Sequence, residues 1–316
     1  MALPELLRGR LALPVIAAPM FLVSSAESVV AQCTAGVVGS LPALNARTTE
    51  MLEDWIIGIK AALAGAAATP GAVVAPFAVN IGIHPANPRV EPDIAVCVRQ
   101  QVPIVITSLR TSSALVQAVH AYGGIVLHDV TTVRHARKAL EAGVDGLVLV
   151  AAGAGGHDGT LNPMALAGEV RSFYNGLLVL AGAVSSGADV LAAQAMGCDL
   201  AYMGTRFLAT AETAASAAHK QMVVDSGSAD IVHTPYFSGL PANYLRGSIA
   251  ASGLDPDALP APDGAGMGAR GRWKDVWGAG QGAGCVREIL PTRQLVSRLT
   301  DEYRAAACQL LSELRD

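Results

Sequence analysis

The chain has 316 residues, of which 52% are hydrophobic and 15% are charged, so it holds enough apolar material for one large core. Its net charge of −4 gives no electrostatic basis for binding nucleic acid or an anionic membrane surface. No apolar run reaches the roughly 18 residues that a membrane-spanning helix needs.

The cysteines give no sign of a disulfide framework or a zinc site, because their number is odd and they form no Cys-x-x-Cys pair. They are Cys33, Cys97, Cys198, Cys285 and Cys308. The first ten residues contain Glu5, Arg8 and Arg10 and do not resemble a secretory signal. We therefore expect a cytoplasmic protein, whose oligomeric state the sequence leaves open.

Eight short apolar runs recur along the first two thirds of the chain without regular polar alternation. They are Ala12–Ala18, Val37–Leu41, Val73–Val79, Ile104–Leu109, Ile125–Val130, Leu147–Ala152, Leu177–Ala181 and Leu200–Met203. Runs of this kind are typical of strands that are buried on both faces.

Segments with helical spacing of apolar residues separate these runs. They are Ser25–Ala35, Thr48–Leu63, Pro92–Gln101, Ser112–Tyr122, Thr131–Ala142, Pro163–Tyr174 and Ala188–Met196. Thr131 or Thr132 before one of them and Gly143 after it are helix start and stop signals. Repeated β/α units predict an α/β fold with a parallel sheet, either an eight-stranded (β/α)8 TIM barrel or an open doubly wound sheet.

A glycine-rich segment carries the strongest functional signal. The apolar run that begins at Gly146 leads directly into Gly153–Gly159, which presents His157 among four glycines. Glycine has no Cβ, so the backbone can approach a flat ligand closely while the imidazole offers a titratable group. The pattern predicts an active-site loop, although a glycine turn with an incidental histidine has the same sequence.

Two further loops follow the seventh and eighth predicted strands. They are Ala181–Gly187 and Met203–Phe207. In α/β barrels these two loops commonly hold a phosphate through backbone amides, so together with the His157 loop they favour a phosphate-bearing cofactor.

Other catalytic signatures are absent from the sequence. No Rossmann fingerprint follows the first strand, and the chain has neither a Walker A lysine motif nor a Gly-x-Ser-x-Gly elbow. His128 and His135 are seven residues apart, which does not match a metal-binding spacing. We expect no metal site.

Six segments in chain order form a specific set of motifs. They are Pro14–Met20, Phe77–Asn80, Gly155–Gly159, Ala181–Ala183, Tyr202–Phe207 and Gly278–Gly282. Together they resemble the motifs of the nitronate monooxygenases, formerly called 2-nitropropane dioxygenases. The resemblance implies an FMN-dependent TIM barrel over residues 1–211, a smaller, mostly helical lid inserted after strand eight over residues 212–284, and a C-terminal helix returning to the barrel over residues 285–316.

The resemblance also implies a role for particular residues. His157 would be the catalytic residue facing the substrate side of the flavin. The residues implied in binding FMN are Ala18, Pro19, Met20, Asn80, His128, Gly155, Gly156, Ala181, Gly182, Ala183, Met203, Gly204, Thr205 and Gln281. Some relatives place a lysine near the flavin where this chain has His128-Asp129, and Asp129 is equally compatible with a helix N-cap.

The implied reaction is the oxidation of alkyl nitronates by O2 to a carbonyl compound and nitrite. Val150–Ala154 lacks the acidic or amide residues that many relatives carry before the histidine, which leaves an NAD(P)H-dependent reductase of quinones or enoyl thioesters as an alternative. A barrel that binds phosphorylated metabolites without flavin is a third class. A Schiff-base aldolase is disfavoured because no lysine lies at a predicted strand end.

Overall fold

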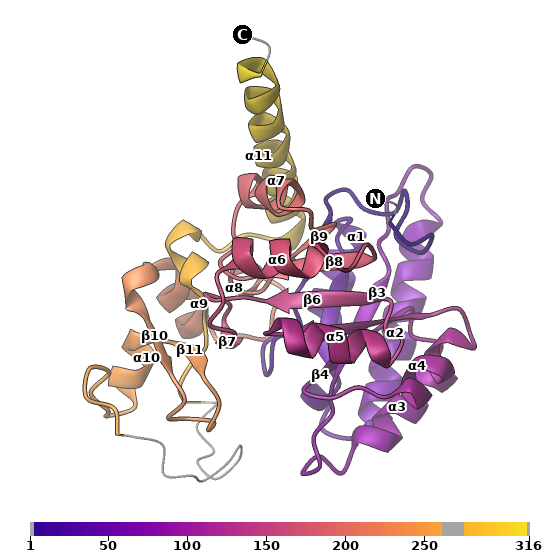
Figure 1. Cartoon of the computed structure of the whole chain (residues 1–316), viewed down its shortest axis with the longest axis horizontal. Helices are drawn as coiled ribbons and strands as arrows, with labels where there is room; N and C mark the ends of the chain where they lie inside the picture. The colour runs from indigo at the N-terminus through magenta and orange to yellow at the C-terminus, as the bar shows by residue number, and fades with distance from the viewer. Residues whose placement is uncertain (1–2, 261–274, 315–316) are drawn as a thin grey trace.

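The computed structural model describes residues 3–260 and 275–314, and in it eight parallel strands form one sheet in the order β1-β9-β8-β6-β5-β4-β3-β2 (Figure 1). A parallel bridge between Ile16 and Val38 joins the two ends of this order, so the sheet closes into the predicted barrel. The strands are β1 Val15–Ala17, β2 Gly39–Pro42, β3 Phe77–Gly82, β4 Ile104–Ser108, β5 Ile125–Val130, β6 Gly146–Val150, β8 Leu177–Ala181 and β9 Leu200–Met203.

Side chains alternate between the two faces of each barrel strand. Ile104, Ile106, Leu127 and Val148 belong to a buried cluster inside the barrel. Their strand neighbours, such as Val105, belong to the larger core between strands and helices. This two-sided burial explains why each strand reads as a continuous apolar run.

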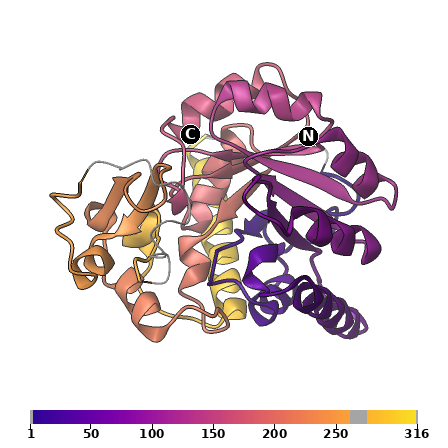
Figure 2. The same ribbon diagram turned by 90° about the horizontal axis from the view of Figure 1, so that it is seen from below.

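Helices surround the barrel, as Figure 2 shows. They are α1 Ala26–Thr34, α2 Thr49–Ala67, α3 Val90–Arg99, α4 Ser113–His120, α5 Val133–Glu141, α6 Pro163–Arg171, α7 Gly187–Ala195, α8 Thr205–Leu208 and α11 Thr292–Glu313. Helix α11 packs against α7 and α1 and so fills the outer layer that the short α8 leaves open. In the described residues, no helix combines the length and apolar character needed to cross a membrane.

Two local expectations need correction. The strand expected at Val73–Val79 begins only at Phe77 and runs to Gly82, because the chain reaches it through an extended segment that contains Pro76. Asp129 is not a helix cap, since the side chain of Thr132 caps α5 by accepting from the His135 amide at 3.2 Å. The carboxyl of Asp129 is thereby left for another role.

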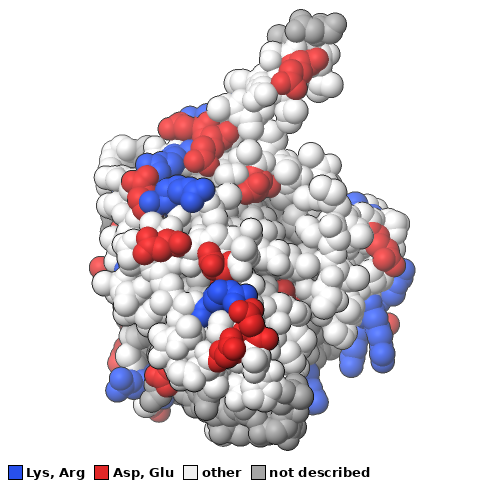
Figure 3. Space-filling model, turned by 90° about the vertical axis from the view of Figure 1, so that its left-hand side faces the viewer, with Lys and Arg blue, Asp and Glu red and all other residues white. Residues whose placement is uncertain are grey.

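Between α8 and α11, the described residues 209–260 and 275–291 form a unit, called the inserted unit below, beside the carboxyl ends of the barrel strands. Its described residues contain α9 (Ala217–Val224) and α10 (Arg246–Ala251), and also the hairpin of β10 (Ile231–Thr234) and β11 (Ala242–Leu245). It is therefore less purely helical than expected. β11 pairs with β7 (Gly156–His157), a short strand from the barrel's own glycine loop. On this side of the molecule, charged groups of both signs form small clusters on an otherwise uncharged surface (Figure 3).

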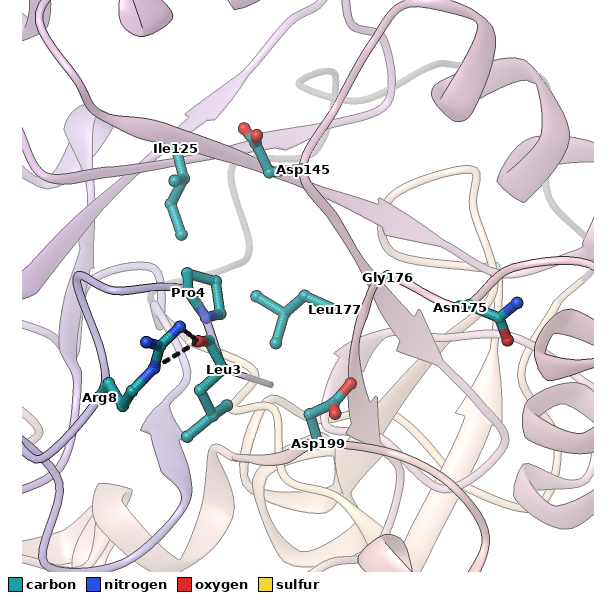
Figure 4. A pocket seen from close by; sticks show the side chains of 9 residues that line it. All are labelled: Leu3, Pro4, Arg8, Ile125, Asp145, Asn175, Gly176, Leu177 and Asp199. Carbon is teal, nitrogen blue, oxygen red and sulfur yellow. Dashed lines mark hydrogen bonds between the residues drawn. The ribbon is translucent and has the colours of Figure 1, made fainter. Parts of the chain in front are cut away.

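The amino end of the barrel is closed by the first residues of the chain. A hollow of about 270 Å³ remains there, lined by Leu3, Pro4 and Arg8 together with the starts of several strands (Figure 4). Arg8 donates to the carbonyl of Leu3 at 3.0 Å, and the nearby Asp145 and Asp199 accept the amides of Val126 and Leu178. The polar groups here hold the scaffold together.

Candidate functional site

A cavity of about 1410 Å³ lies at the carboxyl ends of the barrel strands, under the inserted unit. The expected site residues that line it are Ala18, Pro19, Met20, Asn80, His128, Gly155, Gly156, His157, Ala181, Gly182, Ala183, Gly204 and Thr205. Segments that lie far apart in the sequence thus meet around one space, as expected for a barrel active site.

Two expected cofactor residues do not line this cavity. Met203 is fully buried in the core between strands and helices, because it alternates with Tyr202, whose side chain belongs to the cluster inside the barrel. Gln281 is exposed, and its neighbours Gly280 and Gly282 form the wall instead. A Cβ on Gly153 would lie 3.0 Å from Gln281 Oε1, so Gln281 packs against that loop.

Close backbone contacts explain the glycines in this wall. A Cβ on Gly155 would come within 2.8 Å of the Gly280 amide, and one on Gly280 would come within 2.6 Å of the Gly153 carbonyl. No side chain fits between the two segments. The glycines therefore let the segment around Gly280 pack directly against the loop that carries His157. The imidazole of His157 is then the main functional group in this wall of the cavity.

The loop after β8 has the bare, curved backbone that an anion site needs. Gly182 (φ 129°) and Ala183 (φ 55°) both adopt positive φ, which is uncommon for alanine. Asp189 accepts the amides of Ser185 and Ser186, each at 2.9 Å, and so fixes the following turn.

Gly204 follows β9, the strand that pairs with β8, and lines the same cavity. A Cβ on Gly204 would make only ordinary contacts, 3.7 Å to Ala18 Cβ and 3.8 Å to Met20 Sδ. Its neighbour Thr205 accepts the Gly280 amide through Oγ1 at 2.8 Å. The glycine is therefore not needed for packing, and its missing side chain leaves space within the cavity.

His157 is held by the inserted unit. Its Nε2 lies 3.0 Å from Ser238 Oγ, and that hydroxyl donates to the Leu240 carbonyl at 3.0 Å. Because the serine proton is already used, we assign the Nε2–H of neutral His157 as donor to Ser238, which puts the ring's lone pair on Nδ1. Partial burial lowers the pKa of His157, so the neutral ring is favoured and is suited to accepting a proton.

Asp158 anchors the same loop from its other side. Its Oδ1 lies 2.9 Å from His233 Nε2, while Oδ2 accepts from Asn243 Nδ2 at 2.7 Å and from the Gly153 amide at 3.4 Å. Asn243 also donates to the Ala154 carbonyl. These bonds fix the backbone on both sides of His157.

Four polar side chains form the cavity floor and replace the apolar layers found deeper in the barrel. Asn80 Nδ2 donates to Ser108 Oγ at 2.7 Å, and Ser108 Oγ donates to Asp129 Oδ2 at 2.6 Å. The buried Asp129 Oδ1 and Tyr202 hydroxyl have no hydrogen-bond partner in the part of the chain that the structure describes. Burial raises the pKa of Asp129 to about 6, and burial together with the charge of Asp129 raises the pKa of Tyr202.

The outer rim of the cavity is apolar. Large exposed side chains gather there, namely Phe21, Leu22, Leu44, Leu109 and Leu240. Leu22 (φ 61°) and Leu109 (φ 71°) also adopt the left-handed conformation, which is rare for leucine. Strained residues of this kind concentrate at ligand sites.

Two buried histidines also line the cavity. His128 Nδ1 lies 2.7 Å from Thr107 Oγ1, and His219 stacks on Trp277 with ring centroids 4.9 Å apart. Burial lowers the pKa of each histidine to about 4, so both rings are neutral near pH 7. Sequence reasoning missed His219, Ser238 and Tyr202. Only Tyr202 carried a local signal, since it lies in a quoted motif and alternates with Met203.

The cavity is suited to a flat cofactor that carries a phosphate. The positive-φ loop at Gly182 and the space at Gly204 fit the phosphate, the glycine-lined wall fits a planar ring, and the two unpartnered floor groups offer that ring hydrogen bonds. Fold and site together define an α/β-barrel enzyme with a candidate flavin site. The family model for nitronate monooxygenase matches residues 7–302, and the chain belongs to this family, whose members are generally flavin-dependent oxidoreductases.

Relatives within and around this family differ in activity. A nitronate monooxygenase of Paraburkholderia phytofirmans is 29% identical, with 94% of each chain covered. The structure of a nitroalkane oxidase of Streptomyces ansochromogenes matches with a TM-score of 0.79 and 25% identity, covering 96% of this chain and all of the other. The (3aS,4S,5R,7aS)-5-hydroxy-7a-methyl-1-oxo-octahydro-1H-indene-4-carboxyl-CoA dehydrogenase of Mycobacterium tuberculosis is 29% identical over 74% of this chain and 63% of that protein.

Proposed function

We propose that the protein is an FMN-dependent nitronate monooxygenase, which oxidises alkyl nitronates with O2 to a carbonyl compound and nitrite. The observation that carries the proposal is the position of His157, held by Ser238 at the edge of the cavity that the glycine loops line. The near full-length similarity to a nitronate monooxygenase supports the same activity.

Each part of the site then has a chemical task. The loops at Gly182 and Gly204 bind the FMN phosphate, and the bound flavin supplies the electron acceptor that O2 reoxidises. When a neutral nitroalkane binds, neutral His157 accepts the proton of its acidic carbon, which gives the nitronate. The resulting imidazolium then donates a hydrogen bond to an anionic nitronate oxygen and orients it.

Anaerobic mixing tests this activity directly. The holoenzyme is mixed with propyl nitronate and, in separate experiments, with NADH or NADPH, while the visible flavin band is followed. We expect the nitronate to bleach the band and both nucleotides to leave it nearly unchanged. Rapid bleaching by a nucleotide, with nitronate inert, would establish the reductase activity instead. A protein that is colourless and binds no added FMN would contradict both activities.

The size and apolar rim of the cavity favour a second candidate, an NAD(P)H-dependent reductase of quinones or enoyl thioesters. Pockets for a single small ligand usually occupy roughly 300–1,000 Å³, whereas this cavity measures about 1410 Å³. It has room for a cofactor and a substrate with a large apolar part. Steady-state rates across acceptors of increasing apolar size test this candidate, since rates that fall with size contradict it.

A further inference from the structure

The floor of the cavity contains two buried polar atoms that form no hydrogen bond with any described residue. Asp129 follows the inward-facing Leu127 by two positions on β5, and Tyr202 belongs to the same cluster inside the barrel. Both residues line the cavity, and neither Asp129 Oδ1 nor the Tyr202 hydroxyl has a hydrogen-bond partner among the described residues. A buried polar group without a partner is destabilising, so each atom is a contact point for a ligand.

The other hydrogen bonds of the cavity floor determine whether these two atoms can donate or accept a hydrogen bond. Ser108 gives its single proton to Asp129 Oδ2 and accepts from Asn80, so it has no second proton for a ligand. The Tyr202 hydroxyl is a donor. Asp129 becomes a donor at Oδ1 only as a carboxylic acid, whereas its ionised form would turn a negative acceptor toward the ligand.

The groups that face Asp129 do not favour its ionised form. Among the described residues, Tyr202 from β9 is the titratable group that interacts with it. Strands β3 and β4 contribute the neutral Asn80 and Ser108, and β6 contributes the apolar Val150. No cation in the described part of the floor compensates a carboxylate, in agreement with a pKa raised to about 6.

We propose that Asp129, as a carboxylic acid, and Tyr202 donate hydrogen bonds to the acceptor edge of the bound flavin ring, which makes flavin binding depend on pH. This inference rests on the proposed FMN site. The isoalloxazine ring presents mainly carbonyl oxygens and imine nitrogens, which match two donors and repel a carboxylate. Flavin binding is then strongest below the pKa of Asp129. Above that pKa it weakens, because an ionised Asp129 must take up a proton before it can donate to the flavin.

Equilibrium titration of the full-length apoprotein tests the proposal, with fluorescence quenching as the readout. FMN and riboflavin are both used as probes, because the FMN phosphate itself titrates near pH 6 and riboflavin reports on the ring alone. For the unaltered protein, the riboflavin Kd should rise above about pH 6 by up to about tenfold per pH unit. For Asp129→Asn, whose amide donates at every pH, the Kd should stay flat.

Two further variants separate the parts of the network. Tyr202→Phe should raise the Kd by about 2- to 10-fold at every pH, the loss of one hydrogen bond, and keep the pH dependence. Ser108→Ala removes the bond that favours ionised Asp129, so the onset of weakening should move to higher pH. Ser108→Ala retains Asp129 and tests the proposal even where Asp129→Asn does not fold.

An infrared difference spectrum gives a readout that is independent of affinity. The flavin-bound protein at neutral pH should show the carbonyl band of a protonated carboxylic acid, and Asp129→Asn should lack it. Parallel pH profiles for the unaltered protein and Asp129→Asn would overturn the proposal, and so would an unmoved onset in Ser108→Ala. Failure of every variant to bind either probe would instead contradict the FMN site itself.

Discussion

The two ends of the barrel use carboxylates in opposite ways. At the amino end, Asp199 Oδ2 accepts the Leu178 amide at 2.9 Å and Arg171 Nη2 at 3.0 Å, and Asp145 Oδ2 accepts the Val126 amide at 2.7 Å. At the carboxyl end, one buried oxygen of Asp129 has no partner within residues 3–260 and 275–314. The satisfied carboxylates stabilise the fold, whereas the unsatisfied one is available to a ligand.

Backbone strain follows the same division. Of the described residues other than glycine, four have positive φ, and Leu22, Leu109 and Ala183 among them line the large cavity. Conformations of this kind cost about 1–3 kcal/mol each. The hydrogen-bonded carboxylates thus lie at the amino end of the barrel, and most of the strained residues lie at the carboxyl end. Substitutions at the amino end should therefore change the free energy of unfolding, whereas substitutions at the carboxyl end should change flavin binding or reaction rate.

The largest effect is expected for His157→Ala. The variant should retain its flavin, because the glycine loops are unchanged, but flavin reduction by a neutral nitroalkane should slow by about 10²–10⁴-fold, the usual result of losing a positioned acid–base group. Stopped-flow absorbance measures this rate. His120→Ala, at the amino end, is the matched control and should react normally. A normal rate for His157→Ala would leave the histidine without a chemical role.

Asp199→Ala should give the opposite result. Arg171 and Asp199 are only 16% and 8% exposed, so removing the carboxylate leaves the guanidinium with carbonyl partners but without a countercharge, and should cost about 3–5 kcal/mol of unfolding free energy. Urea denaturation measures this loss, and flavin affinity of the folded variant should not change. The exposed Arg246–Asp257 pair supplies the control, since Asp257→Ala should cost less than about 1 kcal/mol. Equal losses of unfolding free energy in Asp199→Ala and Asp257→Ala would contradict the structural role of the Arg171–Asp199 pair.

Gly204→Leu should weaken flavin binding and leave the fold intact. A Cβ at this position makes ordinary contacts, but a leucine side chain would occupy the space assigned to the phosphate and should raise the FMN Kd by at least about tenfold. Gly168, exposed on α6 with open space around it, provides the control Gly168→Leu. Unchanged FMN affinity in Gly204→Leu would place the phosphate elsewhere.

Much of the scaffold was predictable because its signals are local. All eight predicted strand runs overlap barrel strands, since burial on both faces makes each strand apolar throughout. Ser112 and Thr132 cap the helices that follow them. The error at Val73 also has a local cause, because an apolar segment that leads into a strand has the same composition as the strand itself.

The site was less predictable because its contacts join distant segments. Ser238 meets His157 only through the pairing of β11 with β7, which no local pattern indicates. Strict alternation along β9 would have turned Tyr202 inward and Met203 outward. It does not reveal that Tyr202 lacks a partner, because that depends on every strand around the barrel.

Ser238→Ala should have the smallest effect and reports on how His157 is positioned. We expect a loss of about 2- to 10-fold in kcat/KM, the value of one hydrogen bond. Ser238 accepts from Nε2–H and so favours the imidazolium. Its removal should lower the already lowered pKa of His157 further, and the acid limb of the kcat/KM profile should move to lower pH. Ser238→Thr, which keeps the hydroxyl, should restore both values. A loss of rate with an unmoved acid limb would mean that Ser238 only supports the loop and does not set the protonation of His157.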